Sequence, residues 1–143
     1  MHGLGNDFII FDARELANRI PDVISEAAAI ALADRHFGIG CDQILVIRPS
    51  QRAEIFMQIL NSDGSAATAC GNGTRCVADH IMRELGQDRL AIETDSGILQ
   101  SWRAAENPSH IAVDMGSVCL DWNAVPLASN VNTLSVDLGP LAP

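Results

Sequence analysis

The sequence is poor in positive charge. Only 9 of its 143 residues are Lys or Arg, against 18 Asp and Glu, and the net charge is −9. No stretch gathers basic residues into a patch. Because nucleic-acid binding depends on neutralising backbone phosphates, this acidic balance argues against a nucleic-acid partner.

Long hydrophobic runs are also missing. The longest apolar stretch, Ala27 to Ala33, is far below the roughly 20 residues that a membrane-spanning helix needs. The first residues, Met1 to Asp7, contain neither a basic segment nor a long apolar segment of the kind found in secretory signals. We therefore expect no membrane partner and a cytoplasmic location.

The four cysteines follow no repeated pattern. Cys41, Cys70, Cys76 and Cys119 are expected to be free thiols rather than a disulfide framework. Cys70, Cys76 and His80 together offer two thiols and an imidazole. Zinc usually takes a fourth ligand and short Cys-x-x-Cys spacings, and neither is present. No metal site is predicted.

Apolar residues make up 48% of the chain, enough to build the core of one domain. A helix is expected from an N-cap at Ser25 to about residue 36, and a second from about 72 to 85, stopped by Gly86. Apolar runs closed by turn residues predict strands over 8–11, 43–47, 54–60, 90–94, 98–102 and 111–115, with weaker signals over 125–127 and 134–138. The fold class is α/β (α+β), with one helix packed on a sheet.

The most unusual segment runs from Ala69 to Cys76, directly before the second helical pattern. Its glycines and Asn72 let backbone N–H groups at a helix start approach a ligand closely. Unpaired N–H groups and the helix dipole attract an anion such as a carboxylate. The same field stabilises a thiolate at Cys70, which is then able to accept and return a proton. The alternative from composition alone is a capped helix with a buried cysteine.

Amide side chains occur at three other strand ends or turns: Asn6, Gln43 and Asn61. Such amides suit recognition of ammonium and carboxylate groups, although each by itself is typical of a turn. The Gly-x-Gly near the N-terminus precedes a predicted strand instead of following one, so it does not form a dinucleotide-binding fingerprint.

Taken together, these segments resemble the diaminopimelate epimerase family of pyridoxal-independent amino-acid epimerases. The matching stretches occur in the family's order, and they are 1–8, 34–43, 61–65, 69–76 and 92–97. The resemblance implies two similar halves, each a mixed, mainly antiparallel sheet wrapped around a central helix. Residues 1–117 would form the N-terminal epimerase domain, and residues 118–143 would begin a truncated C-terminal domain.

The resemblance also implies an activity, the interconversion of LL- and meso-2,6-diaminopimelate in lysine and peptidoglycan biosynthesis. It implies no cofactor, a small-molecule amino-acid substrate and a homodimer. Cys70 matches one of two catalytic cysteines. Gly71 and Asn72 match the donors that hold the α-carboxylate, and Asn6, Gln43 and Asn61 match substrate-binding positions.

The second catalytic cysteine of the family lies in another Cys-Gly segment, after a Glu-Arg-Gly motif. Apart from Cys70-Gly71 this chain contains no Cys-Gly segment, and it contains no Glu-Arg-Gly motif. Cys41, Cys76 and Cys119 lack the following Gly. We therefore predict that the chain by itself does not epimerise diaminopimelate.

Three alternatives remain open at this stage. The first is a proline or hydroxyproline racemase or a related isomerase of the same fold. The second is a thiol redox module in which Cys76 resolves an oxidised Cys70, which requires Cα atoms under about 7 Å apart. The third is a non-catalytic binding fragment.

Overall fold

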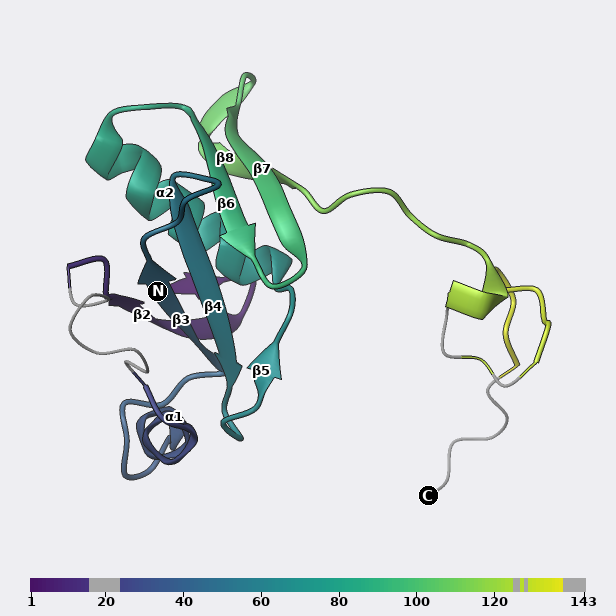
Figure 1. The fold of residues 1–143 in the computed structure, drawn as a ribbon, viewed down its shortest axis with the longest axis horizontal. Coiled ribbons are helices and arrows are strands. Elements are labelled where there is room, and N and C mark those ends of the chain that lie inside the picture. The colour runs from purple at the N-terminus through teal and green to yellow at the C-terminus, as the bar shows by residue number, and fades with distance from the viewer. Residues whose placement is uncertain (16–23, 125–126, 128, 138–143) are drawn as a thin grey trace.

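The computed structural model describes residues 1–15, 24–124, 127 and 129–137 (Figure 1). Within these residues, eight strands form one mixed sheet with the order β1-β2-β3-β4-β6-β7-β8, and β5 pairs with β4. The pairs β2/β3 and β4/β6 are parallel and the other five are antiparallel. The strands are β1 (His2–Gly3), β2 (Asn6–Asp12), β3 (Gln43–Arg48), β4 (Ile55–Asn61), β5 (Ala66–Ala67), β6 (Arg89–Thr94), β7 (Gly97–Ala104) and β8 (Asn107–Asp114).

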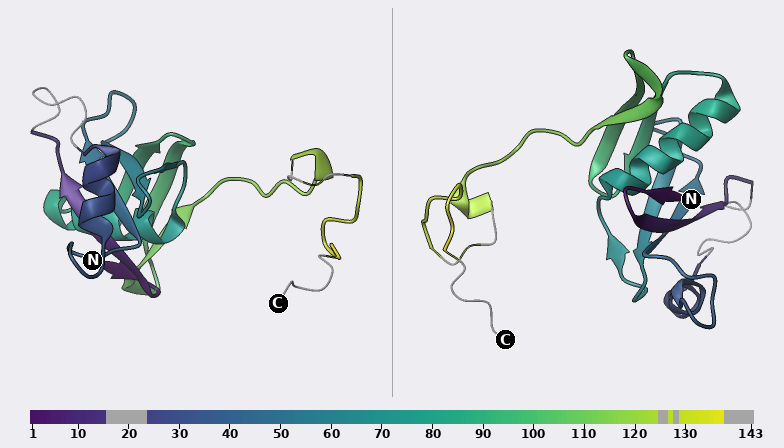
Figure 2. Two further views of the ribbon diagram at one scale, coloured as in Figure 1. Left: turned by 90° about the horizontal axis from the view of Figure 1, so that it is seen from below. Right: turned by 180° about the vertical axis from the view of Figure 1, so that it is seen from behind.

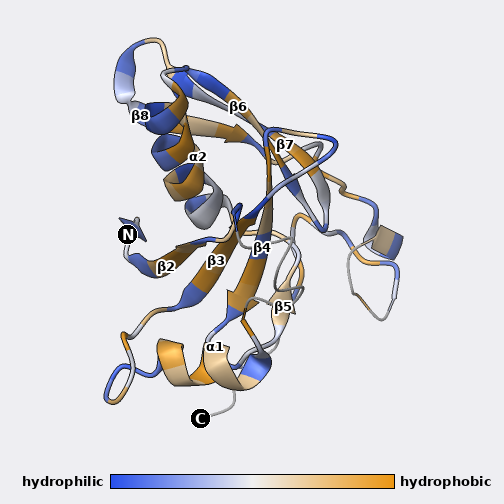
Figure 3. Ribbon diagram, turned by 60° about the vertical axis from the view of Figure 1, so that its left-hand side comes forward, coloured by the Kyte–Doolittle hydropathy of each residue, from blue (hydrophilic) through white to orange (hydrophobic). Residues whose placement is uncertain are grey.

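The helix α2 (Gly71–Leu85) lies in the curve of the sheet (Figures 1 and 2). It contacts strands from both ends of the strand order, β1 and β2 at one end and β6, β7 and β8 at the other. Its apolar side chains recur every three or four residues, which produces one hydrophobic face and one hydrophilic face (Figure 3). The apolar face packs on the sheet through Val77, Ile81 and Met82, each no more than 1% exposed. Gly86 ends the helix in the left-handed conformation, with φ of 66°.

The helix α1 (Glu26–Ala33) covers the other face of the sheet. Strand β3 is buried on both faces because its side chains alternate between the two cores. Leu45 and Ile47 pack on the α2 side, and Ile44 and Val46 pack on the α1 side. This double burial explains why β3 has an unbroken apolar sequence instead of an alternating one.

The predicted helices and the six stronger strand predictions are confirmed, with end shifts of a few residues. The first helix ends at Ala33 rather than near residue 36, because the Asp34 carboxylate accepts the backbone N–H groups of His36 and Phe37 and turns the chain. These two bonds also lower the pKa of Asp34.

After β8 the chain leaves the sheet (Figure 1) and forms one short 3₁₀ turn, Trp122–Ala124. The strand predicted over 134–138 is wrong for its described part, 134–137, which has no strand conformation. Exposed side chains in this region, such as Leu134 at 77%, have no apolar face to pack on. Leu138 and the Val125–Pro126 part of the other weak prediction lie outside the described residues.

Candidate active site

Cys70 occupies the N-cap of α2, as the sequence predicted for a thiol at a helix start. Its backbone is extended, with φ of −153° and ψ of 99°, and its Sγ accepts the N–H of Gly73 at 3.3 Å. Its carbonyl accepts both the backbone N–H and the hydroxyl of the buried Thr74, each at 2.8 Å. These three bonds hold the half-buried thiol in a fixed position.

The first turn of α2 contains no acidic residue. The first N–H groups of an α-helix have no partner within the helix, and Cys70 uses only that of Gly73. Among the described residues the N–H groups of Gly71 and Asn72 have no partner, so they can serve a ligand in the positive field of the helix N-terminus. The arrangement suits an anionic group beside the Cys70 side chain.

Gly73 is required by close packing. A Cβ at this position would lie 3.0 and 3.1 Å from the two Cδ atoms of Leu45 and 3.3 Å from the Sγ of Cys70. Leu45 is fully buried in the core, so it has little room to move away. The glycine lets the first turn lie directly against β3, and this contact sets the position of the thiol.

The structure arranges the predicted amide residues in two pairs. The Nδ2 of Asn72 donates to the Oδ1 of Asn6 at 2.7 Å, which joins α2 to the start of β2 across 66 residues. The Nε2 of Gln43 donates to the Oδ1 of Asn61 at 2.8 Å, because these two residues are direct partners in the β3/β4 register. Within the described residues no direct side-chain hydrogen bond joins the two pairs, so their joint action on one ligand remains a prediction.

Two pockets are lined by residues just before or within the first turns of α2. One has a volume of about 350 Å³ and is lined by residues that include Asn72, Arg75 and Cys76. The other has a volume of about 320 Å³ and includes Ala69, Leu99 and Met115 in its lining. In the sequence, Cys70 lies between Ala69, which lines the second pocket, and Asn72, which lines the first.

Reasoning from the sequence missed three polar partners of these amides. Arg75 Nη2 donates to the Oδ1 of Asn72, Asn6 Nδ2 donates to Asp42 at 3.4 Å, and Asn61 Nδ2 donates to Ser65 at 3.0 Å. The only available signals were the three-residue spacing of Arg75 from Asn72 on the helix and the position of Asp42 beside Gln43.

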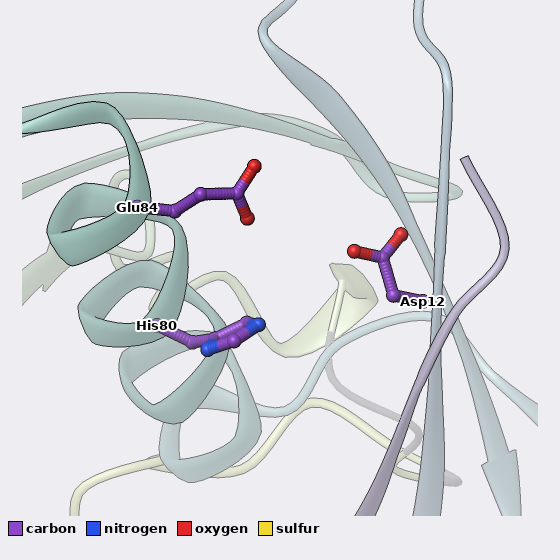
Figure 4. Close-up of side chains that lie close together, drawn as sticks. All are labelled: Asp12, His80 and Glu84. Atoms are coloured by element: carbon purple, nitrogen blue, oxygen red, sulfur yellow. The ribbon is translucent and has the colours of Figure 1, made fainter. Parts of the chain in front are cut away.

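The three residues weighed as a zinc set do not come together. Within the described residues, the one group with ligand spacing is Asp12, His80 and Glu84, whose side chains face one another (Figure 4). The Nη2 of Arg14 already lies 2.5 Å from Asp12 and 2.6 Å from Glu84. The hydrogen bond from Arg14 lowers the pKa of both carboxyl groups. Arg14 thus supplies the positive charge between the two carboxylates. The cluster is an ion-pair link between β2 and α2.

The geometry also weakens the redox alternative. From the N-cap Cys70 to Cys76 the helix rises by about 9 Å, at about 1.5 Å per residue. This separation exceeds the reach of a disulfide between Cα atoms, about 7 Å, unless the first turn unwinds. Cys76 is also buried, and burial raises the pKa of its thiol.

Comparison with known proteins gives a consistent result. A family model described as diaminopimelate epimerase matches residues 1–120. The diaminopimelate epimerase of Rhodospirillum centenum is 47% identical over 141 residues, which are 97% of this chain and 46% of the relative. That of Acidiphilium cryptum is 47% identical over 143 residues, or 99% of this chain and 50% of the relative. The chain spans about half the length of these curated relatives.

Among solved structures, a phenazine biosynthesis protein of the PhzF family from Bacillus anthracis aligns with a TM-score of 0.52 and 24% identity, over 79% of this chain and 35% of that one. A PhzF-family protein from Enterococcus faecalis aligns with a TM-score of 0.51 and 19% identity, over 73% and 39% of the two chains. These likenesses support the fold alone. No helix in the described part of the chain has the length and apolar character to cross a membrane.

Proposed function

The chain belongs to the diaminopimelate epimerase family, and we propose that it supplies one half of a site that interconverts LL- and meso-2,6-diaminopimelate for lysine and peptidoglycan biosynthesis. The observation that carries the proposal is Cys70 at the N-cap of α2, where the first turn has no acid and the N–H groups of Gly71 and Asn72 have no partner among the described residues. Cys70 is the proposed catalytic residue.

The proposed chemistry is a proton transfer at the α-carbon. The Cys70 thiolate forms an S–H bond as the Cα–H bond breaks, and the electron pair delocalises into the α-carboxylate. An amino-acid α-proton is very weakly acidic, so the growing carboxylate charge needs donors that are already in place. The N–H groups of Gly71 and Asn72 would supply them, while Asn6, Gln43 and Asn61 bind the remaining polar groups of the substrate.

A second thiol must return a proton on the opposite face, and the other cysteines here are poor candidates. Cys41 and Cys76 are buried in the two cores, and Cys119 is exposed beyond the sheet. We therefore propose that the second base lies outside this chain. The division at residue 117, a homodimeric assembly and a cytoplasmic location are further proposals that rest on the family.

The test is a titration of the ¹⁵N-labelled chain with meso-diaminopimelate, followed by backbone amide shifts. Gly71 and Asn72 are expected to move, whereas Glu26 and Ala27, at the matched positions of α1, are expected to stay. Unchanged backbone amide shifts at Gly71 and Asn72 would contradict the proposal. Larger shifts with L-proline than with diaminopimelate would favour a sister racemase instead.

The same sample tests the need for a second thiol. Incubation with LL-diaminopimelate in D₂O is expected to produce no meso isomer, because one thiol can only return the proton to the face it came from. Measurable conversion, followed by chiral chromatography, would contradict the proposed half-site.

A further inference from the structure

A chain of side-chain hydrogen bonds runs from α2 to the loop before β3. Arg75 donates to the Oδ1 of Asn72, and Asn72 donates to the Oδ1 of Asn6 at 2.7 Å. Asn6 in turn donates to the Oδ2 of Asp42 at 3.4 Å. We call these four residues the amide relay. It connects three segments that are distant in sequence and includes two of the proposed substrate-binding amides.

The two ends of the amide relay determine its direction. An amide side chain both donates and accepts, and its two ends can be exchanged by a flip. A guanidinium only donates and a carboxylate only accepts. With Arg75 at one end and Asp42 at the other, a single orientation of Asn72 and Asn6 satisfies every bond.

The acceptor end is itself held in place. Asp42 accepts the backbone N–H of Asp7 at 2.8 Å and the guanidinium of Arg35 at 2.9 Å. The Asp7 N–H and then Arg35 lower the pKa of Asp42. Asp42 therefore remains a charged acceptor through the neutral range, and the direction of the amide relay does not depend on pH there.

We infer that Arg75 and Asp42 are positioning residues that turn Asn72 and Asn6 into oriented N–H donors for a carboxylate. Each amide nitrogen has two N–H bonds and the amide relay uses one of them, while each amide oxygen already accepts a bond. The second N–H of each amide is left for a ligand. A carboxylate accepts from both of these N–H groups. An ammonium group would have to use the second lone pair of an oxygen that already accepts a bond, and the guanidinium of Arg75 at the Oδ1 of Asn72 disfavours a cation there.

This inference rests on the proposed function for the identity of the carboxylate, which would belong to the amino-acid substrate. The inference adds that the first turn of α2 prefers anions because of the Asn72 and Asn6 side chains as well as the helix N-terminus. A purely structural relay would hold α2 against β2 equally well, but it would not discriminate between ligand charges.

The experiment follows the side-chain NH₂ signals of Asn6 and Asn72 in the ¹⁵N-labelled chain, with sodium acetate and methylammonium chloride as probes. Acetate is expected to shift both signals and methylammonium neither. Arg75→Met is expected to weaken acetate binding by roughly fivefold, the effect of one lost hydrogen bond. Arg75→Lys, which keeps a donor-only group, should restore it to within about twofold. Arg83→Met, on an exposed arginine of the same helix, is the matched control and should change nothing.

Equal acetate binding in Arg75→Met and the unchanged chain would overturn the inference, and so would shifts with methylammonium. If Arg75→Met fails to fold, Asp42→Asn tests the other end. The amide that this substitution introduces can donate or accept, so the direction is lost and the Asn6 NH₂ signals should split or broaden, whereas a single sharp set would overturn the inference. Acetate shifts without any response to meso-diaminopimelate would contradict the proposed function and leave the amide relay standing.

Discussion

The two helices of this protein begin with the same kind of N-cap bond but differ in the charge of their first turn. Ser25 caps α1 by accepting the N–H three residues later at 3.3 Å, and Cys70 caps α2 by the same bond at the same distance. The next residue is Glu26 in α1 and Gly71 in α2. A carboxylate in the first turn neutralises the helix N-terminus, whereas a glycine leaves its field open.

The helices also differ in what they bury. α1 is almost uniformly apolar and short, and it lies on a core made largely of small side chains such as Ala13, Ala29 and Ala33. α2 is amphipathic, and its buried Ile81 belongs to the same core as large side chains of the sheet such as Met57 and Ile92. In the proposed site, the core anchors α2 along its length while the N-terminus of the helix stays available to a ligand.

The largest expected effect concerns this anchoring. Ile81→Ala removes a fully buried side chain of α2 and should lower the free energy of unfolding by about 3 kcal/mol. Leu32→Ala, on the half-buried face of α1, should cost about half as much. Urea unfolding followed by circular dichroism measures both. Equal losses would show that the two helices contribute alike and would break the comparison.

The third residue is Gly73 in α2 and Ala28 in α1, so each can be replaced by the residue that the other helix has. Gly73→Ala places a Cβ against Leu45 and the Cys70 Sγ, so it should destabilise the chain by about 1–2 kcal/mol through overpacking. Ala28→Gly in α1 should cost about 0.5–1 kcal/mol through backbone entropy alone. Stabilisation by Gly73→Ala, as helix propensity would favour, would contradict the packing argument.

Each of the two cores contains one buried thiol, Cys41 in the core beside α1 and Cys76 on the buried face of α2 itself. Burial raises the pKa of both thiols. The native state then keeps protons that the unfolded chain releases above pH of about 8.5. The contribution of these two thiols to the stability should therefore be constant below that pH and fall as the pH rises further. Urea midpoints from pH 7 to pH 10 check this. Replacement of both residues by Ala should flatten the alkaline decline.

The smallest expected effect concerns the first-turn charge. Gly71→Glu gives α2 the acid that α1 has, and the nearest atoms to its Cβ, at 3.6 and 3.8 Å, leave room for it. The added charge should slow alkylation of Cys70 by iodoacetamide at neutral pH by roughly two- to fivefold.

Gly71→Ala is the control and should leave that rate unchanged, as measured by peptide mass spectrometry that separates Cys70 from Cys119. The reverse change, Glu26→Gln, should cost α1 about 0.5 kcal/mol. An unaltered rate in Gly71→Glu would mean that the open N-terminus of α2 does not stabilise the thiolate.

Most elements were predictable from the sequence because their signals are local. The Ser25 cap, the stop at Gly86 and the turn before Gly97 are each determined by a few adjacent residues. The end of the first helix was missed because the Asp34 side chain captures two N–H groups, and no periodicity records such a bond. The strand predicted over 134–138 failed in its described part, 134–137, because an apolar run becomes a strand only where a partner strand exists.

The sequence by itself determined that Cys70 stands at the start of a helix, between glycines and amides, because a helix start is a local event within one turn. Tertiary structure alone decided which distant amide meets Asn72 in the first turn of that helix. Asn6 reaches Asn72, and Arg75 and Asp42 orient them, through a sheet register and a helix packing that join residues as many as 66 positions apart. It also decided that Cys76 is buried while Cys70 is half open, since burial depends on what lies across the core and not on the neighbours in the chain.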